Sequence, residues 1–101
     1  MRMLMIVQMP IDSFNAAARN GTVAATMRRI LEDTKPESAH FTELDGRRAG
    51  ILVVDVKSAA DIPRLSEPWF LQFNAEVQFR IAMTVEDLAQ ADLAGLGKKW
   101  G

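Results

Sequence analysis

The sequence predicts a single α+β domain whose elements follow the order β-α-β-β-α-β, with a further helix at the C-terminus. Two apolar runs, residues 3–9 and 51–56, are typical of strands that are buried on both faces. Residues 75–83 alternate between apolar and polar side chains, which is the pattern of a strand with one buried face. A chain of 101 residues has the usual size of one domain, so we expect one unit over residues 1–101.

Composition and charge exclude several classes of function. The chain is 49% hydrophobic and 25% charged, which is typical of a globular domain, and its net charge of −1 supplies no basic surface for nucleic acid or for an anionic membrane. The absence of cysteine excludes disulfides, a thiol nucleophile and a thiolate metal site, and one histidine cannot form a multi-histidine centre within one subunit. We therefore expect no metal, no cofactor, and no nucleic-acid or membrane partner.

Residues 1–9 are apolar, but this run is too short for the hydrophobic region and cleavage site of a signal peptide. No apolar run in the chain approaches the roughly 18 residues of a membrane span. We therefore expect a cytoplasmic protein.

The first helical region is predicted to be divided in two. Either Ser13 or Asp12 can cap a helix that starts at Phe14. The apolar stripe of the residues that follow is out of register with Phe14, so we expect a break or a sharp kink at Gly21. A second helix, capped by Thr22, then reaches about residue 35.

Asp45-Gly46 predicts a β-hairpin with a two-residue turn, because both residue types tolerate the positive φ that such a turn requires. Counting outward from this turn pairs residues 38–44 with the strand that contains residues 51–56. The resulting opposite pairs are Leu44 with Arg47, Glu43 with Arg48, Phe41 with Gly50, and His40 with Ile51. The opposite charges of one pair and the aromatic ring over a strand glycine in another support this register.

The second helical region carries two signals for its start. Ser58 opens a capping box, whereas Pro63 favours a start at Asp61. This helix is expected to be short, and Pro68 is expected to begin a separate turn that carries three aromatic side chains. After the alternating strand, Thr84 caps a last helix that reaches about residue 94, and residues 95–101 form a tail.

The order of these elements is the split βαβ pattern of the ferredoxin-like fold, which places the first and third strands at the centre of the sheet. Its helices cover one face of the sheet, whereas both central strands are apolar on two faces. Another copy of the same sheet is the simplest cover for the second face. The sequence therefore predicts a twofold homodimer in which sheet packs against sheet.

The topology resembles the dimeric α/β-barrel superfamily over nearly the whole chain. The aromatic turn at residues 67–70 (EPWF), followed by residues 76–79 (EVQF), is similar to uncharacterised bacterial members related to muconolactone-isomerase-like proteins. The resemblance implies a small homodimeric protein that binds a small apolar or aromatic organic molecule. The alternative that it implies is a cofactor-independent isomerase or monooxygenase-like enzyme acting on small cyclic substrates. No motif in the sequence specifies a reaction.

Two sets of residues are candidates for a ligand site. The polar set could form an acid–base and hydrogen-bonding group inside the dimer barrel, and its members are His40, Arg80, Glu76, Asp55 and Gln8. The alternative for this set is that its members are solvated edge positions or bridge the two subunits. The aromatic set could line an apolar pocket, and its members are Phe14, Trp69 and Phe70. The alternative for the aromatic set is ordinary core packing.

Overall fold

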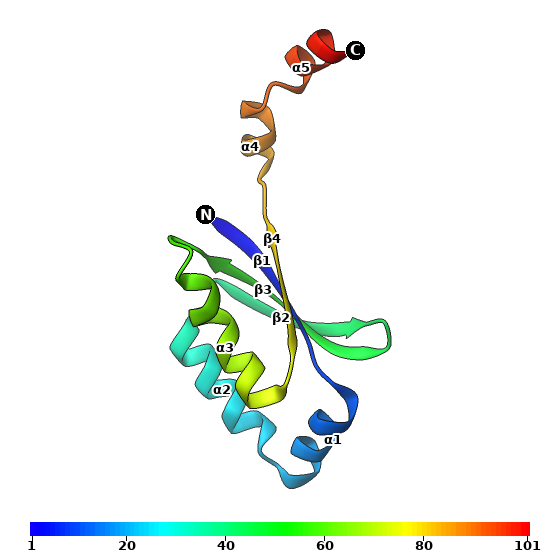
Figure 1. Ribbon diagram of the computed structural model, residues 1–101, viewed down its shortest axis with the longest axis vertical. Coiled ribbons are helices and arrows are strands. Elements are labelled where there is room, and N and C mark those ends of the chain that lie inside the picture. The colour runs from blue at the N-terminus through cyan, green and yellow to red at the C-terminus, as the bar shows by residue number, and fades with distance from the viewer.

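The computed structural model describes residues 1–101 as an α+β fold with one four-stranded antiparallel sheet and five helices (Figure 1). The elements are β1 (Arg2–Gln8), α1 (Ile11–Asn20), α2 (Val23–Thr34), β2 (Ser38–Leu44), β3 (Arg47–Asp55), α3 (Asp61–Phe73), β4 (Glu76–Ile81), α4 (Val85–Gln90) and α5 (Leu93–Trp100). None of the helices combines the length and the apolar character needed to cross a membrane.

The strands lie in the order β2-β3-β1-β4, and each neighbouring pair is antiparallel. The first and third strands are therefore central, and the second and fourth strands lie at the edges. The predicted hairpin register is confirmed at all four pairs. Asp45 and Gly46 have φ values of 53° and 77°, so both turn residues adopt the left-handed conformation that was expected.

Replacing Gly46 with valine should lower the free energy of unfolding by about 1–2 kcal/mol, because a β-branched residue is strained at positive φ. A Cβ atom at this position meets no other atom within 4 Å, so the cost arises from the backbone alone. Urea denaturation measures the effect. Gly46→Asn is the matched control and should cost much less, since asparagine tolerates this conformation. Equal stabilities of the two variants would contradict the turn assignment.

One detail of the hairpin differs from the prediction. Glu43 lies opposite Arg48, but the two side chains do not form an ion pair. Instead, the Glu43 carboxylate accepts a hydrogen bond of 3.0 Å from the Gly46 N–H, which closes the turn. The Arg48 guanidinium donates a hydrogen bond of 2.8 Å to the side-chain oxygen of Asn15 on α1. Glu43 therefore binds the Gly46 N–H and Arg48 binds Asn15, and the two side chains do not pair with each other across the hairpin.

The predicted break between the first two helices is confirmed. Gly21 has a φ of 76° and caps α1, with its N–H directed at the carbonyl oxygens of Ala17 and Ala18. The predicted start of α1 at Phe14 is wrong, since the helix begins at Ile11. Pro10 occupies the N-cap position, and its fixed φ prepares the chain for a helix that starts directly after it.

The predicted interruption at Pro68 is also wrong, because α3 is one helix that runs through this residue. A proline inside a helix removes a hydrogen bond and costs roughly 3 kcal/mol. Leu65, Trp69 and Phe73 follow one another at intervals of four residues, and all three are buried against the sheet. Burial of three large side chains on one stripe offsets the proline, so the helix continues. It starts at Asp61, as the position of Pro63 indicated.

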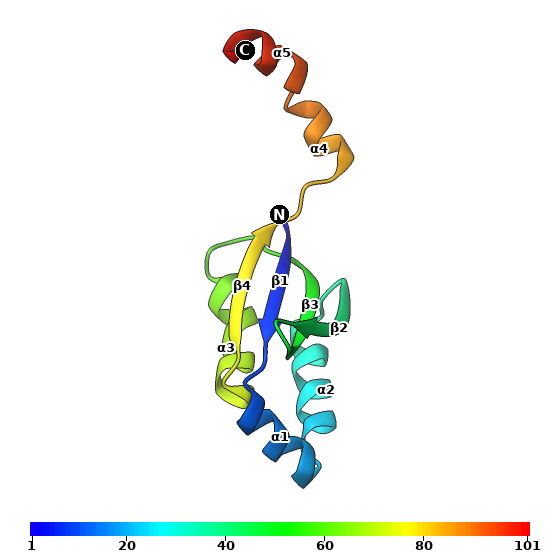
Figure 2. The same cartoon turned by 90° about the vertical axis from the view of Figure 1, so that its right-hand side faces the viewer.

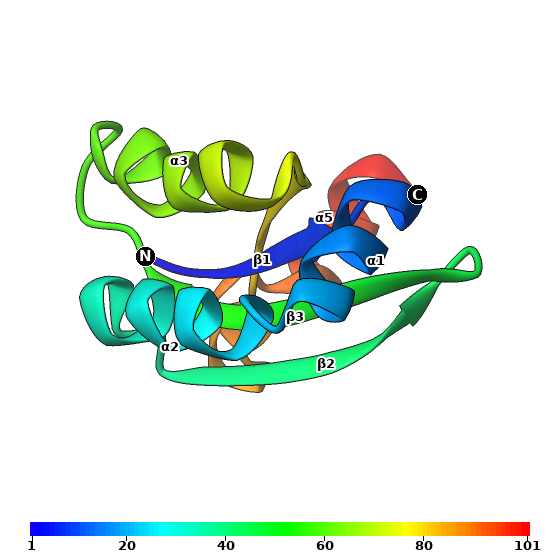
Figure 3. The ribbon, with the colours of Figure 1, turned by 90° about the horizontal axis from the view of Figure 1, so that it is seen from below.

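Helices α2 and α3 lie side by side over one face of the sheet (Figures 1 and 3). Alternate side chains of the central strands pack beneath them, and the core consists mainly of Met5, Val7, Leu52, Val54, Leu65, Trp69 and Phe73. Figure 2 views the sheet from its opposite face, which no helix covers. We refer to this surface as the bare face. Its centre holds the half-buried side chains of Leu4, Ile6, Ile51 and Val53.

Residues 82–101, which we refer to as the C-terminal arm, extend away from the sheet and give the molecule dimensions of 59 × 28 × 19 Å (Figures 1 and 2). The predicted cap at Thr84 is confirmed, since Thr84 and Asp87 exchange side-chain to backbone hydrogen bonds at the start of α4, although this helix ends at Gln90 and not near residue 94. The expectation of a tail at residues 95–101 is wrong. Asp92 caps a further helix, α5, by accepting a hydrogen bond from the Gly95 N–H. Neither helix of the arm contains a buried residue.

Candidate ligand-binding site

A partly open cavity of about 850 Å³ lies between α1, α2 and the β2–β3 hairpin. We refer to it as the helix-side cavity. Eight of the twelve residues in its wall are hydrophobic, namely Met9, Phe14, Val23, Ala24, Met27, Leu31, Phe41 and Ala49. The polar residues in the wall are Arg28, Glu32, Thr42 and Arg48. This volume and this composition are typical of sites for small organic molecules.

The cavity lies beside α2 because the apolar side chains of this helix form two groups with different surroundings. Ile30 and Thr34 are buried in the domain, whereas Val23, Met27 and Leu31 are only half-buried and line the cavity. The latter three residues recur at intervals of four and therefore share one side of the helix. Gly21, which adopts the left-handed conformation between α1 and α2, changes the direction of the chain, so that both helices contribute to the same wall.

Arg48 occupies an unusual position in this wall. Its guanidinium carbon lies 4.8 Å from the ring centroid of Phe14, and its Nη1 atom donates to the Asn15 amide oxygen at 2.8 Å. Phe14 in turn packs against Phe73 of the core, with ring centroids 5.5 Å apart. A neutral amide and an aromatic ring thus fix the cation, and no carboxylate forms an ion pair with it.

Only one of the three aromatic candidates lines this cavity. Phe14 does so, whereas Trp69 is 1% exposed and stacks on Phe73 at a centroid distance of 6.0 Å. Trp69 is therefore a core residue in this structure. Phe70 is 39% exposed on the surface of α3 and contributes to no cavity wall.

Three polar candidates come together on the bare face. Gln8, Glu76 and Arg80 line a pocket of about 380 Å³ near the β2–β3 turn. Each of them has a partner in the same chain: the Leu44 carbonyl oxygen accepts from Gln8 at 3.0 Å, the Arg47 guanidinium lies 3.6 Å from Glu76, and Arg80 donates to Gln78 at 3.4 Å. These contacts hold the sheet residues to one another. None of them joins a carboxylate to a histidine, which would be needed for a proton-transfer pair.

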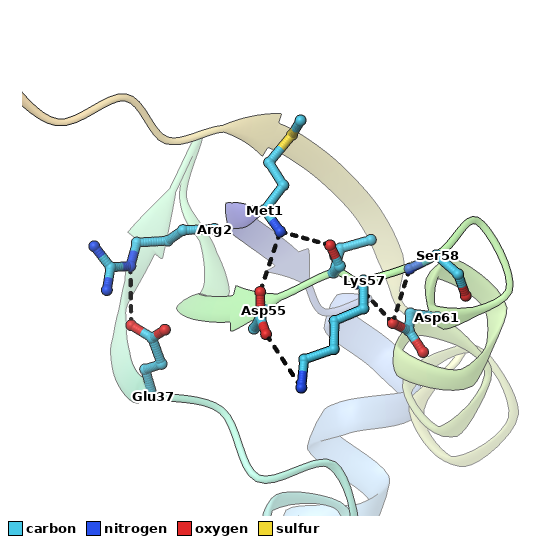
Figure 4. Close-up of polar contacts among 8 residues, drawn as sticks. Met1, Arg2, Glu37, Asp55, Lys57, Ser58 and Asp61 are labelled. Atoms are coloured by element: carbon cyan, nitrogen blue, oxygen red, sulfur yellow. Dashed lines mark hydrogen bonds and ion pairs between the residues drawn. The ribbon is translucent and has the colours of Figure 1, made fainter. Parts of the chain in front are cut away.

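The remaining polar candidates lie elsewhere. His40 is on the edge strand β2, in a cross-sheet row that passes through Ile51 and Ile6 to Gln78 on the other edge. Asp55 lies at the far end of β3, where its carboxylate is 3.2 Å from the Met1 amino group and 3.9 Å from the Lys57 ammonium (Figure 4). Four residues along a strand correspond to roughly 13 Å, so Asp55 and His40 do not meet within one chain.

Figure 4 also shows the polar contacts at the start of α3. Asp61 accepts hydrogen bonds from the backbone N–H groups of Lys57 and Ser58 and from the Arg64 side chain. These bonds, the one from Lys57 first, lower the pKa of Asp61 below the ordinary value of 3.8. Since the folded pKa is depressed, the associated stability is present at neutral pH and is lost as the pH falls through the folded value. Asp61 therefore anchors the helix and lies outside the helix-side cavity.

The sequence predicts Phe14 as a pocket residue, whereas it does not identify Arg48, Phe41 or Leu31 as members of this wall. The sequence contains one signal for this wall, since Leu31 lies at the edge of the apolar stripe that Val23, Met27, Ile30 and Thr34 form on α2. Comparisons with protein-family models, with curated proteins and with solved structures gave no significant match.

Proposed function

We propose that the protein binds a small apolar organic molecule in the helix-side cavity. The observation that carries this proposal is an apolar wall around about 850 Å³ beside the buried core of the domain. Binding displaces water from the exposed ring of Phe41 and from the half-buried side chains of Met27 and Leu31, and this release is the main favourable contribution expected for such a ligand. The polar groups in the wall are few, and they set the orientation of the ligand.

Two adjacent alanines allow a matched test of this proposal. Ala24 and Ala25 are both exposed on α2, but only Ala24 lines the cavity. A panel of small aromatic and alicyclic compounds is first screened by thermal shift, and the hits are titrated by calorimetry. Ala24→Trp should fill the cavity and weaken binding by about tenfold or more, which corresponds to roughly 1.4 kcal/mol. Ala25→Trp should bind as the wild type does. Equal affinities of the two variants, or no binding by the wild type, would contradict the proposal.

We further propose that the chain forms a twofold homodimer through its bare face, as a ferredoxin-like member of the dimeric α/β-barrel superfamily. The strand order β2-β3-β1-β4 supports this assignment. The bare face has an apolar centre on the two central strands and polar side chains, such as His40 and Arg80, on the two edge strands. An apolar centre with a polar rim is the usual composition of a stable interface.

The C-terminal arm supports the same assembly. It carries large apolar side chains that are 44% to 79% exposed, namely Met83, Val85, Leu88, Leu93, Leu96 and Trp100. An arm with this much exposed apolar surface needs a second surface to cover it. In a twofold dimer, each arm can pack on the partner subunit, and symmetry then buries both arms in equivalent contacts.

The polar groups on the bare face are occupied by Leu44, Arg47 and Gln78, and for this reason we propose binding in preference to catalysis. The isomerase or monooxygenase alternative stays a prediction from the resemblance. The cytoplasmic location also stays a prediction from the sequence.

A further inference from the structure

We infer that the ligand of the helix-side cavity is an apolar molecule that ends in a carboxylate, and that Arg48 binds this carboxylate. The inference rests on the proposed function, since it specifies the chemistry of a ligand for the same cavity. Three features of Arg48 carry it, namely its fixed orientation, its lack of an acidic partner and its place in an apolar wall.

The orientation of Arg48 is set before any ligand binds. Asn15 accepts one hydrogen bond from Nη1, and the Phe14 ring supports the guanidinium from one side. A guanidinium has five N–H donors in a planar fork, so this single bond leaves donors available. The fork matches the two oxygens of a carboxylate, and a guanidinium that is already oriented loses little freedom on binding one.

The charge of Arg48 is not neutralised by an ion pair, although carboxylates lie nearby in the sheet. Its neighbour Arg47 lies 3.6 Å from the Glu76 carboxylate. Glu43 is opposite Arg48 in the hairpin, but its carboxylate closes the turn by accepting the Gly46 N–H. The structure therefore directs this one arginine of the hairpin away from the available acids and toward α1.

The other two charged residues of the wall cancel each other and leave the charge of Arg48 in excess. Arg28 and Glu32 stand four residues apart on α2 and both line the cavity. Together with Arg48 they give two positive charges and one negative charge, so the wall has a net positive charge. A ligand with one carboxylate would neutralise this excess, and its apolar body would cover the hydrophobic wall.

The test compares an acid with its uncharged analogue on the full-length protein. The probes are 4-phenylbutyric acid and 4-phenylbutanol, and likewise decanoic acid and decanol, titrated by calorimetry at pH 7. The acid of each pair should bind about tenfold or more tightly than the alcohol, as expected for a charge-assisted bidentate contact. Arg48→Met should reduce the affinity for the acid to that for the alcohol and should leave the affinity for the alcohol nearly unchanged.

Two further variants complete the design. Arg48→Lys keeps the charge and loses the fork, so its affinity for the acid should lie between those of the wild type and Arg48→Met. Arg47→Met, the matched control outside the cavity wall, should leave the preference for the acid intact. Equal binding of acid and alcohol by the wild type would overturn the carboxylate assignment while the cavity remains a ligand site. Binding of neither probe would overturn both. The comparison of acid with alcohol on the wild type needs no variant, so it tests the carboxylate assignment even if Arg48→Met fails to fold.

Discussion

Replacing Trp69 with alanine should lower the free energy of unfolding by about 3–5 kcal/mol, which is the usual cost of removing a large buried aromatic side chain. Trp69 is 1% exposed and stacks on Phe73 in the middle of the core. Its loss leaves a void between α3 and the sheet that the surrounding side chains can fill only in part. Urea denaturation followed by circular dichroism measures the change.

The adjacent residue provides a matched control for this experiment. Phe70 has the same chemical character but is 39% exposed on the outer side of α3. Phe70→Ala should therefore cost less than about 1 kcal/mol, in line with other surface substitutions. Similar losses for the two variants would mean that α3 does not present Trp69 to the sheet, and the continuous helix through Pro68 would then be in error.

Ile51→Asp should convert the proposed dimer into a monomer and weaken association by about a hundredfold or more, since an unpaired charge at the centre of an apolar interface is strongly unfavourable. Ile51 lies on β3, at the centre of the bare face. Light scattering at micromolar concentration should report about twice 11.2 kDa for the wild type and about 11.2 kDa for the variant.

Gln78→Asp adds the same charge at the edge of the same cross-sheet row and should leave the dimer largely intact. Deleting residues 96–101 removes Trp100 and should also weaken association, because Trp100 is 78% exposed in the single chain. A wild type that stays folded and monomeric at these concentrations would refute the assembly.

The parts of the fold that the sequence predicts correctly are those that depend on a few neighbouring residues. The Asp45-Gly46 turn fixes its hairpin within a few residues, and Gly21 ends α1 through its own backbone conformation. The errors arose where packing outweighs local preference. Pro68 is unfavourable in a helix by itself, but the helix continues because Trp69 and Phe73 are buried on one stripe.

The site was harder to predict than the fold for a related reason. Counting from the turn gives the position of each Cβ atom, but it does not determine which partner a long side chain selects. Arg48 has Glu43 opposite it and nevertheless binds Asn15, which is 33 positions away in the sequence. Contacts between α1 and the hairpin depend on the tertiary arrangement, and hydrophobic periodicity contains no information about them.

The alternation of side chains along β3 has a consequence for how this protein can change over time. Arg47 and Ile51 belong to the bare face, whereas Arg48 and Leu52 point toward the helices. A substitution at Arg47, Ile51 or Val53 therefore alters the bare face and leaves the side chains of the helix-side cavity in place, whereas Ala49 belongs to the wall of that cavity. The proposed self-association and the proposed ligand preference can therefore be changed by separate mutations within β3, so selection on one property need not compromise the other.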